Sequence, residues 1–404
     1  MTSRKRMILF FIIQGVFVMG ANFAHPVTPA FFLDLGLPDY MFGVALGSML
    51  IVNFCMSPFW GKMIDYISSK TAMLIGSMGY ALGQFLFISS RNQTEIIASR
   101  MFTGVFTSAA FLALLTYIVN TFDDERERGQ YLTISATIMS VCSAFGFLIG
   151  GLFGEISIGT AFVAQVITIL VCGILFFFVC KSDQKVSIKD AKVKDVAKAS
   201  NPLAAFLASR HFMNFVLLAL FLGVISHAIG HTAFDQSFNY ALRERFNFSP
   251  GYNGMIRGAM GITTLLVNST ITLWIIRRTD MRKSLIWIFA SGSVMMFIAI
   301  VTLSYPAPFI GANIIVFACA SMSMPLIQNM VAKVAAGKNS NLIMGFSESM
   351  RSLGGIIGAF LAGFLYDVMP VYPFIFGLLA FICACVFASI YYKRSKALQI
   401  EEDD

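Results

Sequence analysis

FVLLALFLGVISHAIGHTAFDQSFNY, residues 215–240, joins an apolar run of membrane-crossing character to a stripe of ionisable residues. His227, His231 and Asp235 follow one another at four-residue spacing. In an α-helix this spacing places the three side chains along one face, each about one turn above the last. Ionisable side chains at membrane depth are costly, so they normally face a bundle interior or a wet cavity. This stripe is therefore the first candidate for a functional site.

The composition excludes a soluble domain. The 404 residues are 57% hydrophobic and only 12% charged, whereas roughly a quarter of a soluble chain is charged. The start MTSRKRM lacks a small-residue cleavage site and predicts a retained first helix. The seven Cys show neither a disulfide framework nor metal-ligand spacing. No Walker loop and no nucleophile–base spacing is present, so we expect no enzyme, cofactor or metal site.

Twelve apolar segments, each near the ~20 residues that a bilayer requires, are separated by charged or Gly/Pro-rich breaks. The pattern predicts an all-α integral membrane protein with 12 transmembrane helices in two six-helix halves, the symmetry of a two-repeat transporter. We expect an N-terminal bundle (residues 1–180), a cytoplasmic linker (181–210), and a C-terminal bundle with a short cytoplasmic tail (211–404). The segments are approximately 7–33, 40–60, 71–89, 96–119, 130–153, 158–180, 212–240, 251–276, 284–303, 309–333, 342–366 and 371–392.

The basic residues predict the orientation. Of the 29 Lys and Arg residues, 23 fall in the N-terminus, alternate loops, the central polar segment and the C-terminal tail. Such a bias places both termini in the cytoplasm of a multi-pass protein of the cell membrane. It also explains the net charge of +8 by topology, so we expect no nucleic-acid partner.

The loop after the second segment reads GKMIDYISSKT, beginning at Gly61. It resembles the signature of the major facilitator superfamily, G-x-x-x-D-R-x-G-R-K, at Gly61, Asp65 and Lys70. Tyr66 and Ser68 stand where the signature has Arg and Gly. The glycine would permit a close helix approach, and the aspartate would accept hydrogen bonds from a helix N-terminus or an Arg. The alternative is that Asp65 and Lys70 are ordinary charged residues of a cytoplasmic loop, without a role in transport.

Two further segments carry elements of the same superfamily. SRMFTGVFTSAAF, with Arg100 and Gly104, resembles its R-x-x-x-G element, in which a buried Arg is linked to proton transfer. CSAFGFLIGG resembles the antiporter motif G-x-x-x-G-P-x-x-G-G at Gly146, Gly150 and Gly151, with Phe in place of the Pro. Such small residues let two helices pack backbone to backbone. A snorkelling Arg100 and ordinary small-residue packing stay open as alternatives.

The seventh segment gives the closest resemblance. HTAFDQSFNY is similar to the corresponding stretch of the quinolone-type, proton-coupled multidrug exporters, in which an acidic residue of this helix takes up the coupling proton. Asp235 aligns with that residue, whereas a second acidic position of those exporters is Ser321 here. The resemblance implies a secondary active transporter that exports amphipathic organic compounds by proton antiport and alternating access. Apolar surroundings disfavour the charged carboxylate, so Asp235 would bind and release a proton, with His231 as relay and Arg100 as a third coupling residue.

A substrate cavity is predicted from polar, cationic and aromatic side chains of several segments. Pro26 and Pro29 interrupt the first helix beside His25, and freed carbonyls line cavities in transporters. The first and seventh segments are repeat equivalents, so His25 and His231 would face each other. For His227 a structural hydrogen bond is the alternative. The predicted cavity residues are Asn22, His25, Phe32, His227, Arg257, Met322 and Arg351.

Because two arginines of the predicted cavity could bind an anion, the sequence does not decide whether the substrate is cationic or anionic. Arg351 has an acid, Glu348, three positions away and is expected to pair with it. Arg257 has no such neighbour, so it pairs with Asp235 or binds an anionic substrate. The second candidate function is therefore an organic-anion transporter or exchanger that uses Arg100, Arg257 and Arg351, and the third is a non-transporting membrane receptor. The expected partners are a small-molecule substrate, protons and the lipid bilayer, with the chain as a monomer.

Overall fold

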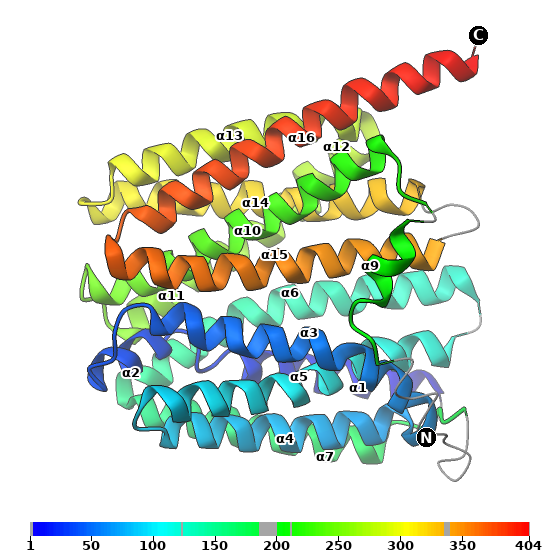
Figure 1. The fold of residues 1–404 in the computed structure, drawn as a ribbon. Helices are drawn as coiled ribbons and strands as arrows, with labels where there is room; N and C mark the ends of the chain where they lie inside the picture. Colours follow the sequence, from blue (N-terminus) through cyan, green and yellow to red (C-terminus); the bar gives the residue numbers. More distant parts are fainter. Residues whose placement is uncertain (1–2, 123, 186–199, 211, 335–339, 404) are drawn as a thin grey trace. The chain divides into compact units, whose positions relative to one another are not determined.

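The computed structural model describes residues 3–122, 124–185, 200–210, 212–334 and 340–403, and within these ranges it contains helices and no strand (Figure 1). The helices of the N-terminal half are α1 (Ser3–Ala21), α2 (Thr28–Asp34), α3 (Met41–Ile67), α4 (Ser69–Ser89), α5 (Gln93–Thr121), α6 (Glu125–Ile156) and α7 (Ile158–Val179). Those that follow are α9 (Ala204–Ser209), α10 (Phe215–Glu244), α11 (Pro250–Val267), the π-helical η2 (Asn268–Thr272), α12 (Leu273–Arg278), α13 (Met281–Val301), α14 (Pro306–Val334), α15 (Ser340–Val368) and α16 (Tyr372–Asp403).

Membrane-crossing helices account for most of the chain. Among the described residues, 11 helices are long and apolar enough to span a bilayer, with α11, η2 and α12 together forming one of them. Each contains one of the predicted apolar segments, so the all-helical membrane fold is confirmed. The first predicted segment is divided between α1 and α2, and α1 has only 19 residues and begins with basic side chains. The full number of 12 spans therefore stays a prediction.

The interruption of the first segment occurs where its prolines predict it. α1 ends at Ala21, six residues of turn follow, and Pro29 lies in the first turn of α2. The last carbonyl of α1 would lack a partner in an apolar environment. Instead, the Ala21 carbonyl accepts hydrogen bonds from Tyr80 Oη (3.2 Å) and Gln165 Nε2 (2.8 Å). Side chains of α4 and α7 thus stabilise the end of α1.

Contacts between Cα atoms divide the chain into two compact units. The first unit comprises Met1–Leu37, Ser48–Pro202 and Leu242–Gly261; the second comprises Pro38–Gly47, Leu203–Ala241 and Ile262–Asp404. Each unit is built mainly from one half of the sequence, and both α3 and α11 begin in one unit and end in the other. The predicted division at residues 181–210 stays a prediction, since residues 186–199 of that linker lie outside the described ranges.

In the first unit, α1 packs on α6 and α7, and α4 packs on α5 and α7. The glycines of α6 allow the contact with α1. A Cβ on Gly146 would lie 2.5 Å from the carbonyl oxygen of Met19, and one on Gly150 would overlap the backbone of Phe23. The two helices are therefore in backbone contact, as the spacing of small residues predicts. Gly151 makes a similar approach to the first turn of α11.

In the second unit, α13 packs on α14 and α16, and α15 packs on α16. The first turns of α3 also belong to this unit. A Cβ on Gly43 would lie 2.6 Å from the backbone nitrogen of Gly363 in α15, so these helices also touch through their backbones. Beside this contact, Tyr240 Oη donates a 2.6 Å hydrogen bond to Asp39 Oδ1, and its ring stacks on Phe42 with centroids 4.7 Å apart.

Ser68 precedes α4 in a conformation that favours glycine. Its φ is +75° and its ψ is 153°, a region that is strained for residues with a side chain and costs roughly 1–3 kcal/mol. Replacing Ser68 by Gly should therefore raise the free energy of unfolding by about 1 kcal/mol, measured as a higher melting temperature of the purified protein in detergent.

Ser69→Gly is the matched control for Ser68→Gly. Ser69 is the first residue of α4, and both its backbone nitrogen (2.7 Å) and its Oγ (2.5 Å) donate to the Asp183 carboxylate. This second change should lower the melting temperature. A lower melting temperature for Ser68→Gly would show that the conformation of Ser68 carries no strain.

Gly150→Ala should destabilise the first unit, because the added methyl group overlaps the backbone of Phe23, in the turn that follows α1, and this overlap cannot be relieved by rotating a side chain. Gly129→Ala in the same helix meets no atom within 4 Å and should leave stability unchanged or slightly higher. Thermal unfolding of the two variants tests the contact directly. Equal melting temperatures would contradict a backbone contact between α6 and the turn that follows α1.

Candidate functional site

His227 lies in the interior of the second unit. Its side chain is 4% exposed, and its Nε2 is hydrogen-bonded to Oγ of Ser323 on α14 at 2.7 Å. The rings of Phe289 and Phe381 lie beside the imidazole, with centroid distances of 5.5 and 5.4 Å. The Ser323 hydroxyl also donates to the Ala320 carbonyl at 2.7 Å. Because a hydroxyl has one proton, in that state it accepts from Nε2–H of His227.

His231 and Asp235 continue the stripe along α10 and are both less buried than His227. The His231 ring stacks near His227 with centroids 5.9 Å apart and meets Phe317 edge-on at 5.7 Å. Asp235 is half-buried, and its Oδ2 accepts a hydrogen bond from Gln236 Nε2 at 3.2 Å. The stripe predicted from the four-residue spacing is therefore present, with His227 buried and His231 and Asp235 both half-buried.

The facing part of α14 supplies polar groups that the sequence pattern only partly indicated. Ser321, aligned with the second acidic position of the resembling exporters, is half-buried and donates to the Ala318 carbonyl at 2.9 Å. Met322 is also half-buried. Ser323 is fully buried and is the residue that contacts His227, yet a serine among small residues gave no signal of this role.

A second group of predicted cavity residues gathers in the first unit around Phe147 of α6. The His25 ring lies 5.3 Å from the Phe147 ring, and the Arg257 guanidinium of α11 lies over the same ring at 5.5 Å. His25 is exposed, whereas Arg257 is only 7% exposed. Asn253, one turn before Arg257, donates to the Pro26 carbonyl at 3.2 Å. Cation, imidazole and aromatic ring thus meet at the break between α1 and α2.

The other predicted residues of this unit make contacts that stabilise the fold. Asn22 is half-buried and donates to the Val18 carbonyl at 2.8 Å. Phe32 is fully buried and packs edge-on against Phe87 with centroids 5.9 Å apart. The Arg100 guanidinium stacks on Phe87 at 3.6 Å, which holds it inside the unit instead of letting it snorkel to the surface.

Arg351 on α15 forms the predicted pair with Glu348. Its Nε donates to Glu348 Oε2 at 2.9 Å, and both side chains are exposed. This local pair neutralises the charge of Arg351 at little energetic cost. A contact of Arg351 with substrate stays a prediction.

The residues of the signature loop take partners other than those expected. Asp65 is paired with Lys62 (3.2 Å) and with Lys185 (3.3 Å), the latter from the segment that follows α7. An Arg or a helix N-terminus was expected in this place. Lys70 lies over the ring of Phe177 at 4.8 Å.

Gly61 of the signature loop and Gly104 of the R-x-x-x-G element differ in how closely another helix approaches them. Gly61 is exposed, and a Cβ there would lie at an ordinary 3.6 Å from Leu112, so the expectation of a close helix approach at Gly61 is wrong for the described neighbours. Gly104 does mediate such an approach, because a Cβ there would overlap the carbonyl oxygen of Met49.

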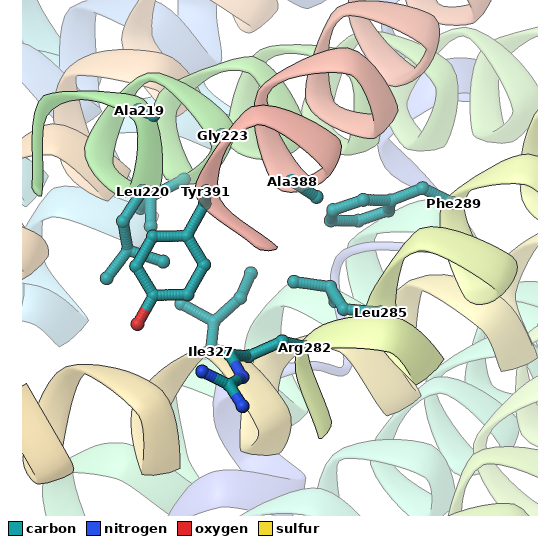
Figure 2. Close-up of a pocket in the computed structure, with 10 residues that line it drawn as sticks. Ala219, Leu220, Gly223, Arg282, Leu285, Phe289, Ile327, Ala388 and Tyr391 are labelled. Carbon is teal, nitrogen blue, oxygen red and sulfur yellow. The ribbon is translucent and has the colours of Figure 1, made fainter. Parts of the chain in front are cut away.

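A small pocket opens in the second unit among α10, α13, α14 and α16 (Figure 2). Arg282 and Tyr391 lie towards one end, and Phe289, which also packs on His227, lies at the other. Arg282 is held by Asp280, at 3.1 Å (Nε) and 3.2 Å (Nη2), and by Ser395 at 3.3 Å. Partial burial acts to raise the pKa of the Asp280 carboxyl, but the hydrogen bonds from Arg282 hold it below the ordinary value. The remaining lining side chains are Ala219, Leu220, Val224, Leu285, Ile327 and Ala388.

Within the described part of the chain, no group of three or more His, Cys, Asp or Glu side chains is arranged to hold a metal ion. The side chains of the two clusters are suited to proton binding, hydrogen bonding and ionic or aromatic recognition. Asp235 and His231 can exchange protons, and Arg257 with Phe147 can bind an anion or an aromatic group.

Known proteins resemble this chain over almost its full length. Multidrug resistance protein 2 of Bacillus subtilis (strain 168) is 21% identical over 379 residues, which cover 93% of this chain and 92% of that protein. The quinolone resistance protein NorA of Staphylococcus aureus is 23% identical over 376 residues and 92% of each chain.

Solved structures share the fold. A bacterial homologue of the iron transporter ferroportin, solved in an inward-facing state, has a TM-score of 0.74 and 13% identity over 97% of this chain and 99% of that one. The human organic anion transporter MFSD10 (TETRAN) has a TM-score of 0.68 and 16% identity over 96% and 100%.

The family comparison agrees with the signature loop and the helical pattern. The family model described as Major Facilitator Superfamily matches residues 10–316 and 220–402. Members of this family are transporters and not enzymes, and the curated relatives are named for multidrug and quinolone resistance. This multi-pass membrane protein belongs to the Major Facilitator Superfamily of transporters.

Proposed function

We propose that this transporter exports amphipathic organic compounds in exchange for protons by alternating access. The observation that supports it most directly is the α10 stripe, in which half-buried Asp235 lies one turn beyond His231 in a membrane-spanning helix. A titratable carboxylate within a membrane-spanning helix is energetically costly, and this cost favours a functional role for Asp235. The names of the two bacterial relatives point to the same class of substrate.

Competition at Asp235 supplies a mechanism for the exchange. The carboxylate is neutralised either by a proton on one of its oxygens or by a cationic substrate beside it, and one group excludes the other. Substrate arriving from one side releases the proton there. A proton arriving from the other side releases the substrate, and the change of access between these events completes the exchange.

We assign separate roles to the two histidines of the stripe and to Arg100. His231, one turn from Asp235, has an imidazole that can take up and release a proton, and we assign it the role of proton relay. His227 is held by Ser323 and two phenylalanine rings, so we assign it an anchoring role. Arg100 keeps its charge at any physiological pH and supplies a fixed positive field in its own unit.

The proposed arrangement in the membrane follows the distribution of basic residues. Both termini lie in the cytoplasm, the chain spans the cell membrane, and it works as a monomer. In this orientation, inside-out vesicles that are acidified internally present the protein with the gradient that drives export.

Asp235→Asn should abolish proton-driven accumulation of an amphipathic cationic dye, such as ethidium, in inside-out vesicles. The amide has the size of the carboxyl group but cannot take up a proton, so we expect at least a roughly ten-fold loss of accumulation. Binding of the dye should weaken as well, because in this mechanism the same carboxylate neutralises the cationic substrate.

Asp367→Asn provides the control for this change. Asp367 is an exposed carboxylate near the end of α15, also in the second unit. Its variant should accumulate the dye normally. If Asp235→Asn retains full gradient-driven accumulation, the coupling proton binds elsewhere.

Transport of an organic anion is the second candidate, and Arg257 favours it. The guanidinium is buried over Phe147 and shares that ring with His25, an arrangement that fits an aromatic carboxylate. A protein that shares the fold at 16% identity is titled an organic anion transporter.

Arg257→Gln should weaken the binding of an aromatic dicarboxylate, such as phthalate, by roughly ten-fold or more if the anion function is correct. Binding to the purified protein is measured by calorimetry, and its pH dependence should survive. Arg91→Gln, which removes an exposed cation between α4 and α5, should bind phthalate as the unmodified protein does. Unchanged phthalate binding by Arg257→Gln would contradict an anion site at Arg257.

A further inference from the structure

The end of α12, the start of α13 and a stretch of α16 lie together at one end of the second unit (Figure 1). These segments are rich in basic residues. The Arg282 guanidinium of α13 is bonded to Ser395 of α16 at 3.3 Å, which ties these elements together. Around this bond, six basic side chains are exposed. We call this set the basic rim, and it consists of Arg277, Arg278, Lys283, Lys393, Arg394 and Lys396.

Among the described side chains, the acidic group nearest in sequence to Arg278 and Lys283 is already engaged. Asp280 lies between α12 and α13, but its carboxylate is already engaged by two nitrogens of Arg282. Among the side chains that the structure describes, none of the six rim residues is paired with a carboxylate. Arg394 lies over the ring of Phe215 at 5.6 Å, which fixes one cation of the rim in place. The surface therefore presents a concentrated positive charge.

Two tryptophans place this charge at the edge of the bilayer. Trp274 and Trp287 are 60% and 67% exposed, and each is four residues from a rim residue, Arg278 and Lys283. Exposed tryptophans on membrane-spanning helices prefer the level of the lipid headgroups. The third tryptophan of the chain, Trp60, is buried and donates to the Val105 carbonyl at 2.8 Å.

We propose that the basic rim binds the headgroups of anionic phospholipids in the leaflet on the side of the C-terminus. Lys and Arg near such a surface each strengthen the attraction to anionic lipid, about five-fold per side chain. The indoles flank the cations at headgroup depth, so the phosphate and the rim meet without burying charge in hydrocarbon. A purely topological role of basic loops requires neither the unpaired cluster nor the flanking tryptophans.

Fluorescence quenching tests this site. In a Trp60→Phe background, only Trp274 and Trp287 emit, and both lie beside the rim. The full-length protein is reconstituted in phosphatidylcholine vesicles with increasing mole fractions of brominated phosphatidylglycerol or, separately, brominated phosphatidylcholine. We expect half-maximal quenching at a roughly ten-fold lower mole fraction of the anionic lipid. About 0.5 M salt should remove the difference, because it shortens the screening length to a few Å.

Charge-removing variants localise the effect. Arg277→Gln, Arg278→Gln and Lys283→Gln together should make the two brominated lipids quench equally. Removing three exposed cations of the first unit, by Arg4→Gln, Lys5→Gln and Lys181→Gln, should leave the preference intact. The proposal is overturned if the Trp60→Phe protein is quenched equally by both lipids. It is also overturned if the first-unit variant loses the preference as fully as the rim variant.

Discussion

A polar group inside hydrocarbon must find its partner within the protein, and this constraint explains the placement of most buried polar side chains here. The Ala21 carbonyl, left over where α1 ends, is bound by Tyr80 and Gln165. Gln14 of α1 donates a 2.6 Å hydrogen bond to Ser135 of α6, and both are fully buried. His227 and Ser323 join α10 to α14 in the same way. These bonds fix which face of each helix meets its neighbour.

Glycine contacts supply the second part of the packing, and they recur in the two halves of the sequence. In the first unit, Gly151 of α6 approaches Gly254 at the start of α11, with a Cβ on Gly151 2.9 Å from its Cα. In the second unit, Gly363 of α15 approaches Gly43 at the start of α3 at 3.0 Å. α3 and α11, like the end of α10, belong partly to one unit and partly to the other. Close backbone contacts thus occur at the starts of both α3 and α11, the positions that the predicted two-repeat organisation makes equivalent.

Periodicity and hydropathy predicted the fold well because the bilayer imposes them directly: apolar runs became helices, and Pro26 and Pro29 interrupted the first one. Local spacing also predicted the Glu348–Arg351 pair, which depends only on helix geometry. Partners distant in sequence could not be predicted. Ser323 resembles any small residue of a helix, and the Lys185–Asp65 pair depends on the path of the chain after α7. Hydrophobic patterning contains no information on such pairs.

The α10 stripe places a residue held firmly by its neighbours, His227, on the same helical face as the proposed proton-binding residue, Asp235. His227 is enclosed by Phe289, Phe381 and Ser323, so ionising it would place a charge among rings with one hydroxyl beside it. That environment suits an anchor that fixes the rotation of α10 against α14. With the rotation fixed, the positions of His231 and Asp235 one and two turns away are fixed as well. In the proposed exchange, the anchored His227 thereby sets the position of Asp235, which would take up the coupling proton.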